Sequence, residues 1–84
     1  MSDTEGFTPE ELAVLAQVGA AVRTARLAAG LTQQAVATEA QLQRSYVAGV
    51  EAGSRNASVL SLARIAHALG LDVASMLGAG RTTA

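Results

Sequence analysis

The sequence has no cysteine and no tryptophan, and proline, phenylalanine and tyrosine each occur once in its 84 residues. Without cysteine, the fold can contain neither a disulfide bond nor a thiolate ligand for a metal ion. No apolar run approaches the roughly 20 residues of a membrane-spanning helix. The first residues, MSDTEGF, lack the basic and then apolar pattern of a signal peptide. These absences predict a cytoplasmic protein.

Patterns that form β-strands are also missing. Hydrophobic residues, mostly Ala, Leu and Val, make up 50% of the chain, but they do not alternate with polar residues over the length of a strand. A chain of this size builds one small core. The composition therefore predicts a single all-α domain.

Charge is distributed unevenly along the chain. The net charge is −1, and four of the seven acidic residues lie within residues 3–11, which leaves three acids against six arginines in the remainder. This surplus is modest for a protein that binds nucleic acid without sequence preference. For a DNA-binding protein of this composition, dimerisation and specific contacts would have to supply the affinity.

A helix start is clear at Thr8-Pro9-Glu10-Glu11, which combines an N-cap, a proline at the first helical position and a carboxylate three residues after the cap. An apolar stripe continues from there to Gly30, through Leu12, Leu15, Val18 and Val22. Gly19 lies within it. The sequence allows either one long helix or a short leading helix followed by a second that begins near Val18.

The middle of the chain predicts two short helices, about 32–40 and 44–52, joined by a sharp corner that buries Leu42. Thr32 is a good N-cap for the first helix. In the second helix, Val47 and Val50 face inward, and the opposite face carries Arg44, Ser45, Ala48 and Gly49. A helix with donors at its start and small residues behind them can enter the major groove of DNA.

Two further helices follow the polar turn at residues 53–56. Ser58 caps the first of them, which ends at Gly70, and Asp72 caps a short last helix with the apolar residues Val73, Met76 and Leu77. We expect residues 1–7 to form a disordered acidic tail, residues 8–77 to form the domain and residues 78–84 to form a flexible tail.

Several short markers lie between Val18 and Leu77, namely Arg23-x-x-Arg26, Gly30-Leu31-Thr32-Gln33, Ala37, Glu51-x-Gly53 and Arg55-Asn56. Together they resemble the lambda-repressor/Cro-like helix-turn-helix family, also called the XRE family. The resemblance implies a five-helix bundle, here with an N-terminal helical extension. Three positions depart from the family pattern: Gln41 stands where the turn usually has glycine, Gln43 where the second helix usually has a Ser, Thr or Asp cap, and Ala57 where a proline often follows the asparagine.

Within that family, residues 44–51 followed by Arg55-Asn56 are most similar to the controller proteins of restriction–modification systems. These dimeric regulators bind their own promoter region and time the expression of the endonuclease relative to the methyltransferase. The resemblance implies a sequence-specific transcriptional regulator that binds an inverted-repeat operator as a homodimer. The alternative is an antitoxin or a phage-type repressor that also binds a protein partner, for which Leu12 and Leu15 offer an apolar surface.

Docking geometry and resemblance together assign the residues of the site. DNA bases are expected to contact Arg44, Ser45 and Gly49. DNA phosphates are expected to contact Gln33, Gln43, Tyr46, Ser54, Arg55 and Asn56. A structural ion pair is expected between Arg26 and Glu51, and a dimer interface at Leu60, Met76 and Leu77.

Enzymatic residues are not evident. His67 is the single histidine, and the sequence contains no pattern that pairs a nucleophile with a base or gathers metal ligands. We therefore expect double-stranded DNA and a second copy of the chain as partners, with no catalysis, cofactor, metal or small-molecule ligand.

Overall fold

The computed structural model describes residues 3–78, which contain helices and no strand. The helices are α1 (Pro9–Ala28), α2 (Gln33–Ala40), α3 (Arg44–Glu51), α4 (Val59–Ala68) and α5 (Val73–Gly78). The expected all-α fold with five helices is confirmed. Of the tail expected at 78–84, residues 79–84 lie outside the described part of the chain.

Helix α1 is one continuous helix of 20 residues, which decides between the two alternatives that the sequence allowed. Its start is fixed by a reciprocal pair of hydrogen bonds. The Glu11 N–H donates to Thr8 Oγ1 at 3.1 Å, and the Thr8 N–H donates to Glu11 Oε1 at 2.9 Å. The N-terminal extension is therefore the first half of α1 rather than a separate element.

Gly19 does not interrupt α1 but allows another helix to approach it. A Cβ atom at Gly19 would lie 2.4 Å from the carbonyl oxygen of Val50 and 2.5 Å from that of Glu51. The last turn of α3 therefore rests directly on the backbone of α1. Sequence reasoning treated Gly19 only as a possible break, because spacing along one helix gives no sign of a crossing helix.

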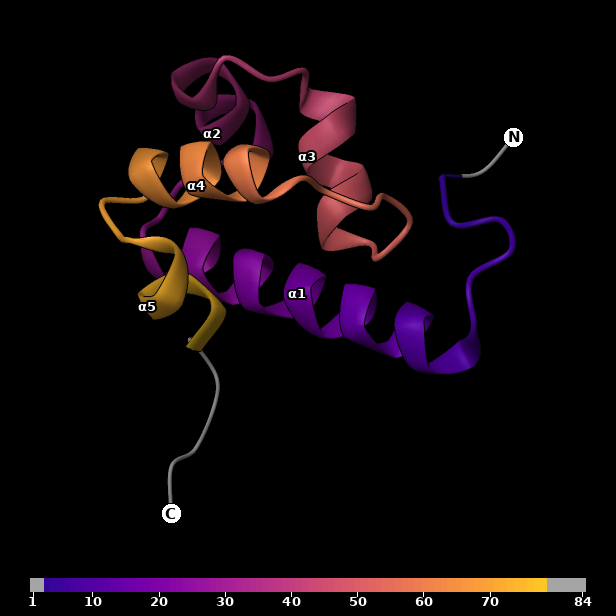
Figure 1. Ribbon diagram of the computed structural model, residues 1–84. Helices are drawn as coiled ribbons and strands as arrows, with labels where there is room; N and C mark the ends of the chain where they lie inside the picture. Colours follow the sequence, from indigo (N-terminus) through magenta and orange to yellow (C-terminus); the bar gives the residue numbers. More distant parts are fainter. Residues whose placement is uncertain (1–2, 79–84) are drawn as a thin grey trace.

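The core lies between α1 and the other helices. Figure 1 shows α1 running along one side of the bundle, with α2, α3 and α4 on the opposite side and α5 near the C-terminal half of α1. Helix α1 packs against α3 and α5, and α2 packs against α3 and α4. The largest fully buried side chains are Val22, Val36, Val47, Val50, Ile65 and Met76.

Met76 corrects one sequence-based expectation, because it was assigned to a dimer interface and is fully buried within one subunit. Helix α5 folds against both α1 and α4, and Met76 is the residue of that short helix that joins the common core. Leu77 is half-buried, whereas Leu60 is 75% exposed. Of the three predicted interface residues, Leu60 alone has a largely free side chain.

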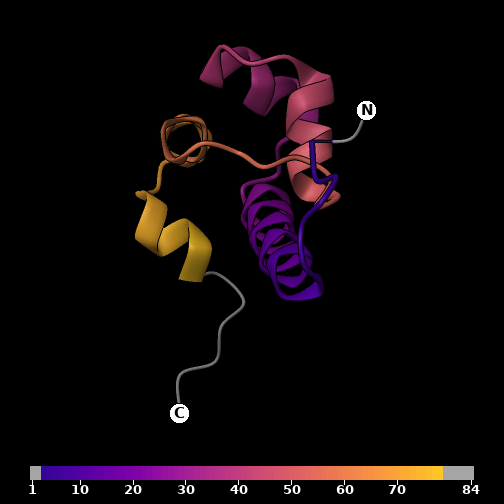
Figure 2. The same ribbon diagram turned by 45° about the vertical axis from the view of Figure 1, so that its right-hand side comes forward.

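The N-terminal segment lies beside the loop that connects α3 to α4, as Figure 2 shows. Asp3 Oδ2 accepts a hydrogen bond of 2.8 Å from the Asn56 N–H. On the other side of this loop, a Cβ atom at Gly53 would lie 3.1 Å from the Cα of Ala16 in α1. Residues 3–7 thus have defined neighbours, and the domain boundary at residue 7 remains a prediction.

No single helix within residues 3–78 is long and apolar enough to cross a membrane. Helices α1 and α2 reach the length and apolar composition of a membrane span only when they are taken together, and the chain bends by 100° at the break between them.

Replacing Gly19 with Ala should destabilise the protein, although Ala favours a helix by about 1 kcal/mol over Gly. The added methyl group would meet two backbone carbonyl groups that cannot rotate away, and overpacking of this kind costs roughly 1–3 kcal/mol. Thermal unfolding measures the result. Ala20→Gly, at the exposed neighbouring position, reports the helix propensity alone. A Gly19→Ala protein that melts above the parent would show that α1 and α3 are not in close contact.

Candidate nucleic-acid interface

Helices α2 and α3 form the expected pair around a sharp corner. Thr32 caps α2, with its Oγ1 accepting from the Ala35 N–H at 3.0 Å. Gln41 ends α2 in the left-handed conformation, with φ 59° and ψ 42°, and the following Leu42 N–H donates to the Ala37 carbonyl at 2.9 Å. A non-glycine residue in this conformation costs on the order of 1 kcal/mol. The departure from the family pattern at position 41 is therefore a strained one.

Helix α3 presents two different faces. Val47 and Val50 are buried, whereas Arg44 and Ser45 are exposed at the start of the helix. Gln43 is the N-cap residue, but its side chain makes no capping hydrogen bond. The exposed start of α3 therefore combines a guanidinium group, a hydroxyl group and backbone N–H groups that no side chain caps.

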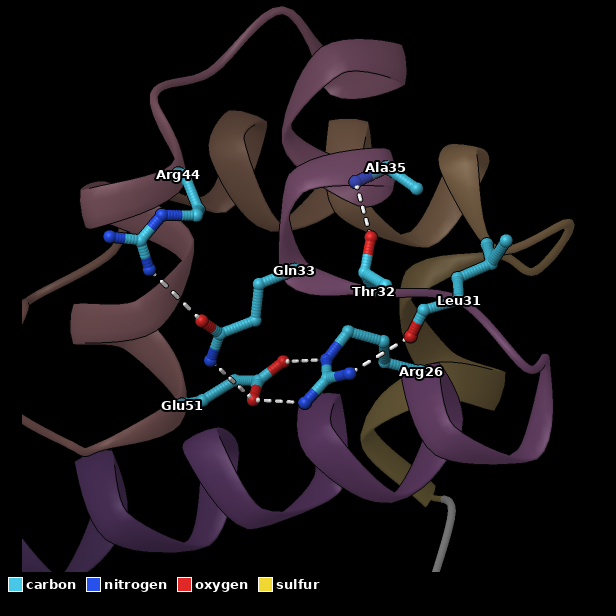
Figure 3. Close-up of polar contacts among 7 residues, drawn as sticks. All are labelled: Arg26, Leu31, Thr32, Gln33, Ala35, Arg44 and Glu51. Atoms are coloured by element: carbon cyan, nitrogen blue, oxygen red, sulfur yellow. Dashed lines mark hydrogen bonds and ion pairs between the residues drawn. The ribbon is translucent and has the colours of Figure 1, made fainter.

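Arg26 and Glu51, which were predicted to pair, form a bidentate salt bridge beneath α2 and α3 (Figure 3). Arg26 Nε donates to Glu51 Oε2 at 2.6 Å, and Arg26 Nη2 donates to Oε1 at 3.0 Å. The third nitrogen, Nη1, donates to the Leu31 carbonyl at 2.8 Å. Their side chains are only 10% and 3% exposed, so the pair joins α1, α3 and the α1–α2 loop inside the bundle.

The environment of this pair favours its charged form. The hydrogen bond to Glu51 raises the pKa of Arg26. Burial alone would raise the pKa of Glu51, but the hydrogen bonds from Arg26 and Gln33 and the positive charges of Arg26 and Arg23 together hold that pKa below its ordinary value. Glu51 is therefore an ionised carboxylate in the folded protein.

The ion pair extends to the exposed surface through Gln33, as Figure 3 shows. Gln33 Nε2 donates to Glu51 Oε1 at 3.1 Å, and Gln33 Oε1 lies 3.5 Å from Arg44 Nη1. The predicted phosphate ligand Gln33 is thus oriented by a buried carboxylate. Sequence reasoning did not foresee this link, because 18 residues separate Gln33 from Glu51.

Arg55 lies across the outer side of α3 at the other end of the interface. Its guanidinium carbon is 5.2 Å from the centre of the Tyr46 ring, within the range of a cation–π contact. A Cβ atom at Gly49 would lie 2.6 Å from Arg55 Cγ. Gly49 therefore makes room for Arg55, and Arg55 covers part of the surface that was predicted to face a base.

The loop after α3 is held by the helix that precedes it. Both the N–H and the hydroxyl group of Ser54 approach the Gly49 carbonyl, at 2.9 and 3.2 Å. The Asn56 N–H is bound by Asp3. Ser54 thus acts as a cap for α3. The DNA contacts assigned to Ser54, Gly49 and the other interface residues remain predictions.

Comparison with known proteins adds to this geometry. The family model described as "Helix-turn-helix" matches residues 22–75. The chain is 38% identical over 61 residues to the immunity repressor protein of Bacillus phage phi105, and it covers 42% of that protein. It is 35% identical over 60 residues to the control protein C.BamHI of Bacillus amyloliquefaciens, of which it covers 74%. These matches extend over 73% and 70% of the chain, respectively.

Two solved structures are similar in both fold and sequence. The restriction-modification controller protein C.AhdI from Aeromonas hydrophila aligns with a TM-score of 0.74 and 39% identity, over 76% of this chain and 97% of that chain. C.Esp1396I bound to a 19 base pair DNA duplex aligns with a TM-score of 0.70 and 33% identity, over 76% of this chain and 89% of that chain. The first half of α1 lies outside the matched family model.

Replacing Glu51 with Gln should destabilise the fold, because Arg26 would remain buried without a charged partner, a loss of roughly 3–5 kcal/mol. The substitution should also make the free energy of unfolding depend less on pH in the acidic range. A carboxylate whose pKa is lower in the folded state stabilises it above the unfolded pKa of about 4.3, and this contribution disappears as the pH falls through the folded pKa.

Thermal unfolding across the acidic and neutral pH range tests both effects. Glu39→Gln, which removes an exposed carboxylate from α2, is the matched control and should follow the parent. Replacing Arg26 and Glu51 together with Met should be less harmful than Glu51→Gln alone, because no uncompensated charge stays buried. If the stability of Glu51→Gln depended on acidic pH in the same way as that of the parent, the role of the ion pair would be contradicted.

Proposed function

Because the chain belongs to the helix-turn-helix family that matches its residues 22–75, we propose that it is a sequence-specific DNA-binding transcriptional regulator of the restriction–modification controller type. The observation that carries this proposal is the pair α2 and α3, with Arg44 and Ser45 exposed at the start of α3. An α-helix in the major groove reads base edges with such residues, and Arg binds guanine in a bidentate manner.

The proposed DNA contacts divide into two kinds. Arg44 and Ser45 read bases, with Gly49 as a close-approach position beside Arg55. Phosphates are bound at the start of α2 by Gln33 and free backbone N–H groups, because a helix N-terminus favours an anion. Flanking phosphates are bound by Gln43, Tyr46, Ser54, Arg55 and Asn56. The C.Esp1396I complex with a DNA duplex supports this class of partner.

Similarity to several controller proteins favours a controller over a phage-type repressor. The chain is 35% identical to C.BamHI, 39% identical to C.AhdI and 33% identical to C.Esp1396I. The likeness to the repressor supports the broader function, regulation through DNA binding. A controller acts on its own promoter region, which we propose as the operator of this protein.

Two subunits are needed for this function. One short recognition helix contacts few base pairs, and one subunit presents few arginines to the phosphates, so its affinity alone is low. We propose a homodimer joined through Val59 and Leu60 of α4, which are 73% and 75% exposed, and through the half-buried Leu77 of α5. A two-fold dimer places its recognition helices roughly 34 Å apart, and the operator is then an inverted repeat.

Footprinting of the protein on the DNA immediately upstream of its own gene tests the proposed function. We expect protection of an inverted repeat whose half-sites are separated by about one turn of DNA. Binding that is equal on an unrelated duplex would oppose a sequence-specific regulator.

Arg44→Ala and Arg55→Ala should affect DNA binding differently. Loss of Arg44 should reduce the discrimination between the operator and a mutated operator by roughly 1–3 kcal/mol. Loss of Arg55 should weaken binding to all duplexes and reduce the slope of log affinity against log salt by about one. Titrations at several salt concentrations separate the two outcomes. An unchanged specificity ratio for Arg44→Ala would reject its base-reading role.

Leu60→Asp should convert the free protein to a monomer, because it places a charge in the proposed apolar contact. Leu27→Asp is the matched control, since Leu27 is also exposed but lies on α1. Sedimentation at micromolar concentration measures the oligomeric state. A monomeric parent would exclude the proposed dimer. A Leu60→Asp protein that remains dimeric would show that the interface lies elsewhere.

A further inference from the structure

The hydrogen bond between Asp3 and Asn56 occurs at a predicted DNA contact. The Asn56 N–H belongs to the loop after α3, where backbone and side-chain donors are proposed to bind phosphate. In the free protein this N–H already has an anionic acceptor, Asp3 Oδ2 at 2.8 Å. A carboxylate oxygen and a phosphate oxygen are equivalent acceptors for a backbone N–H, so one N–H cannot bind both fully.

The rest of the segment adds a second exposed carboxylate and one half-buried aromatic ring. Glu5 is exposed and lies two residues from Asp3, so the segment carries two carboxylates within residues 3–5. A depression of about 240 Å³, lined by Phe7, Val14, Leu15 and Asn56 among others, lies between this segment, α1 and the loop. Phe7 is half-buried beside this depression, whereas Asp3 and Glu5 are exposed, so the acidic end of the segment can detach without exposing a buried apolar core.

We propose that Asp3 competes with a DNA phosphate for the backbone N–H of Asn56, so that the acidic N-terminal segment is an internal competitor that DNA must displace. The inference rests on the proposed function and adds a regulatory contact to its phosphate site. The apparent affinity for DNA is reduced by the fraction of molecules in which the segment is attached.

Asp3→Ala should therefore bind DNA more tightly than the parent. An exposed hydrogen bond with a charged acceptor favours molecules with the segment attached only modestly over molecules with it detached. The expected gain in affinity is therefore roughly three- to tenfold. Glu5→Ala is the matched control, because it removes the same charge from the same segment and keeps the Asp3 carboxylate. The full-length proteins are titrated against a labelled duplex of the DNA upstream of the gene. Amide exchange of the Asn56 N–H in the free proteins gives a second readout, which should become faster in Asp3→Ala alone.

The outcomes separate this inference from the proposed function. A gain in Asp3→Ala that clearly exceeds the gain in Glu5→Ala, with faster Asn56 exchange, supports the competition. Equal affinities of the parent and both variants would overturn the competition and leave the DNA-binding function intact. Weaker binding by Asp3→Ala would also overturn it, because the segment would then support the loop. Failure of all three proteins to bind any duplex would overturn the proposed function together with the competition.

Discussion

The buried salt bridge between Arg26 and Glu51 is the interaction on which the interface depends. Its two side chains come from α1 and α3, its third donor fixes the Leu31 carbonyl before α2, and its carboxylate orients Gln33 at the start of α2. A hydrophobic pair could hold α1 against α3, but it could not set the direction of a glutamine amide. The ion pair therefore joins α1 to α3 and also positions a polar group at the surface, where Gln33 approaches Arg44.

The second constraint is the close approach of α3 to α1 at Gly19. The carbonyl groups of the last turn of α3 rest where a Cβ atom would otherwise be, so Glu51 lies deep enough to reach Arg26. Further along, Gly53 passes close to Ala16, and the loop with residues 54–56 follows the first half of α1. The N-terminal extension of α1, which lies outside the matched family model, is thus a support for the proposed phosphate-binding loop.

Sequence patterns predicted the helices because capping residues and apolar spacing are local. Thr8, Thr32 and Ser58 each cap the helix that follows them, and Asp72 accepts a hydrogen bond from the Ser75 N–H at the start of α5. Long-range features were visible only through family resemblance, as for Arg26 with Glu51, or not at all, as for Gly19 and for Asp3 with Asn56. Met76 was misplaced for a related reason. An apolar residue in a short terminal helix has the same pattern whether it faces a partner or its own core, and only the fold of α5 against α1 and α4 distinguishes the two.

The corner between α2 and α3 has two positions, 41 and 43, at which another residue would give more stability, and Gln43 is a proposed phosphate contact. Gly at 41 would remove the strain of a left-handed glutamine, and Ser or Asp at 43 would cap α3, each for a gain of about 1 kcal/mol. A capping side chain would also occupy a backbone N–H at the start of α3, beside Arg44. With Gln43 in this place, no side chain caps those N–H groups, and the positive end of the helix dipole faces outward. The departure from the family pattern at position 43 thus lies where an anion is expected, and the Arg26–Glu51 ion pair, through Gln33, joins α2 and α3 beside it.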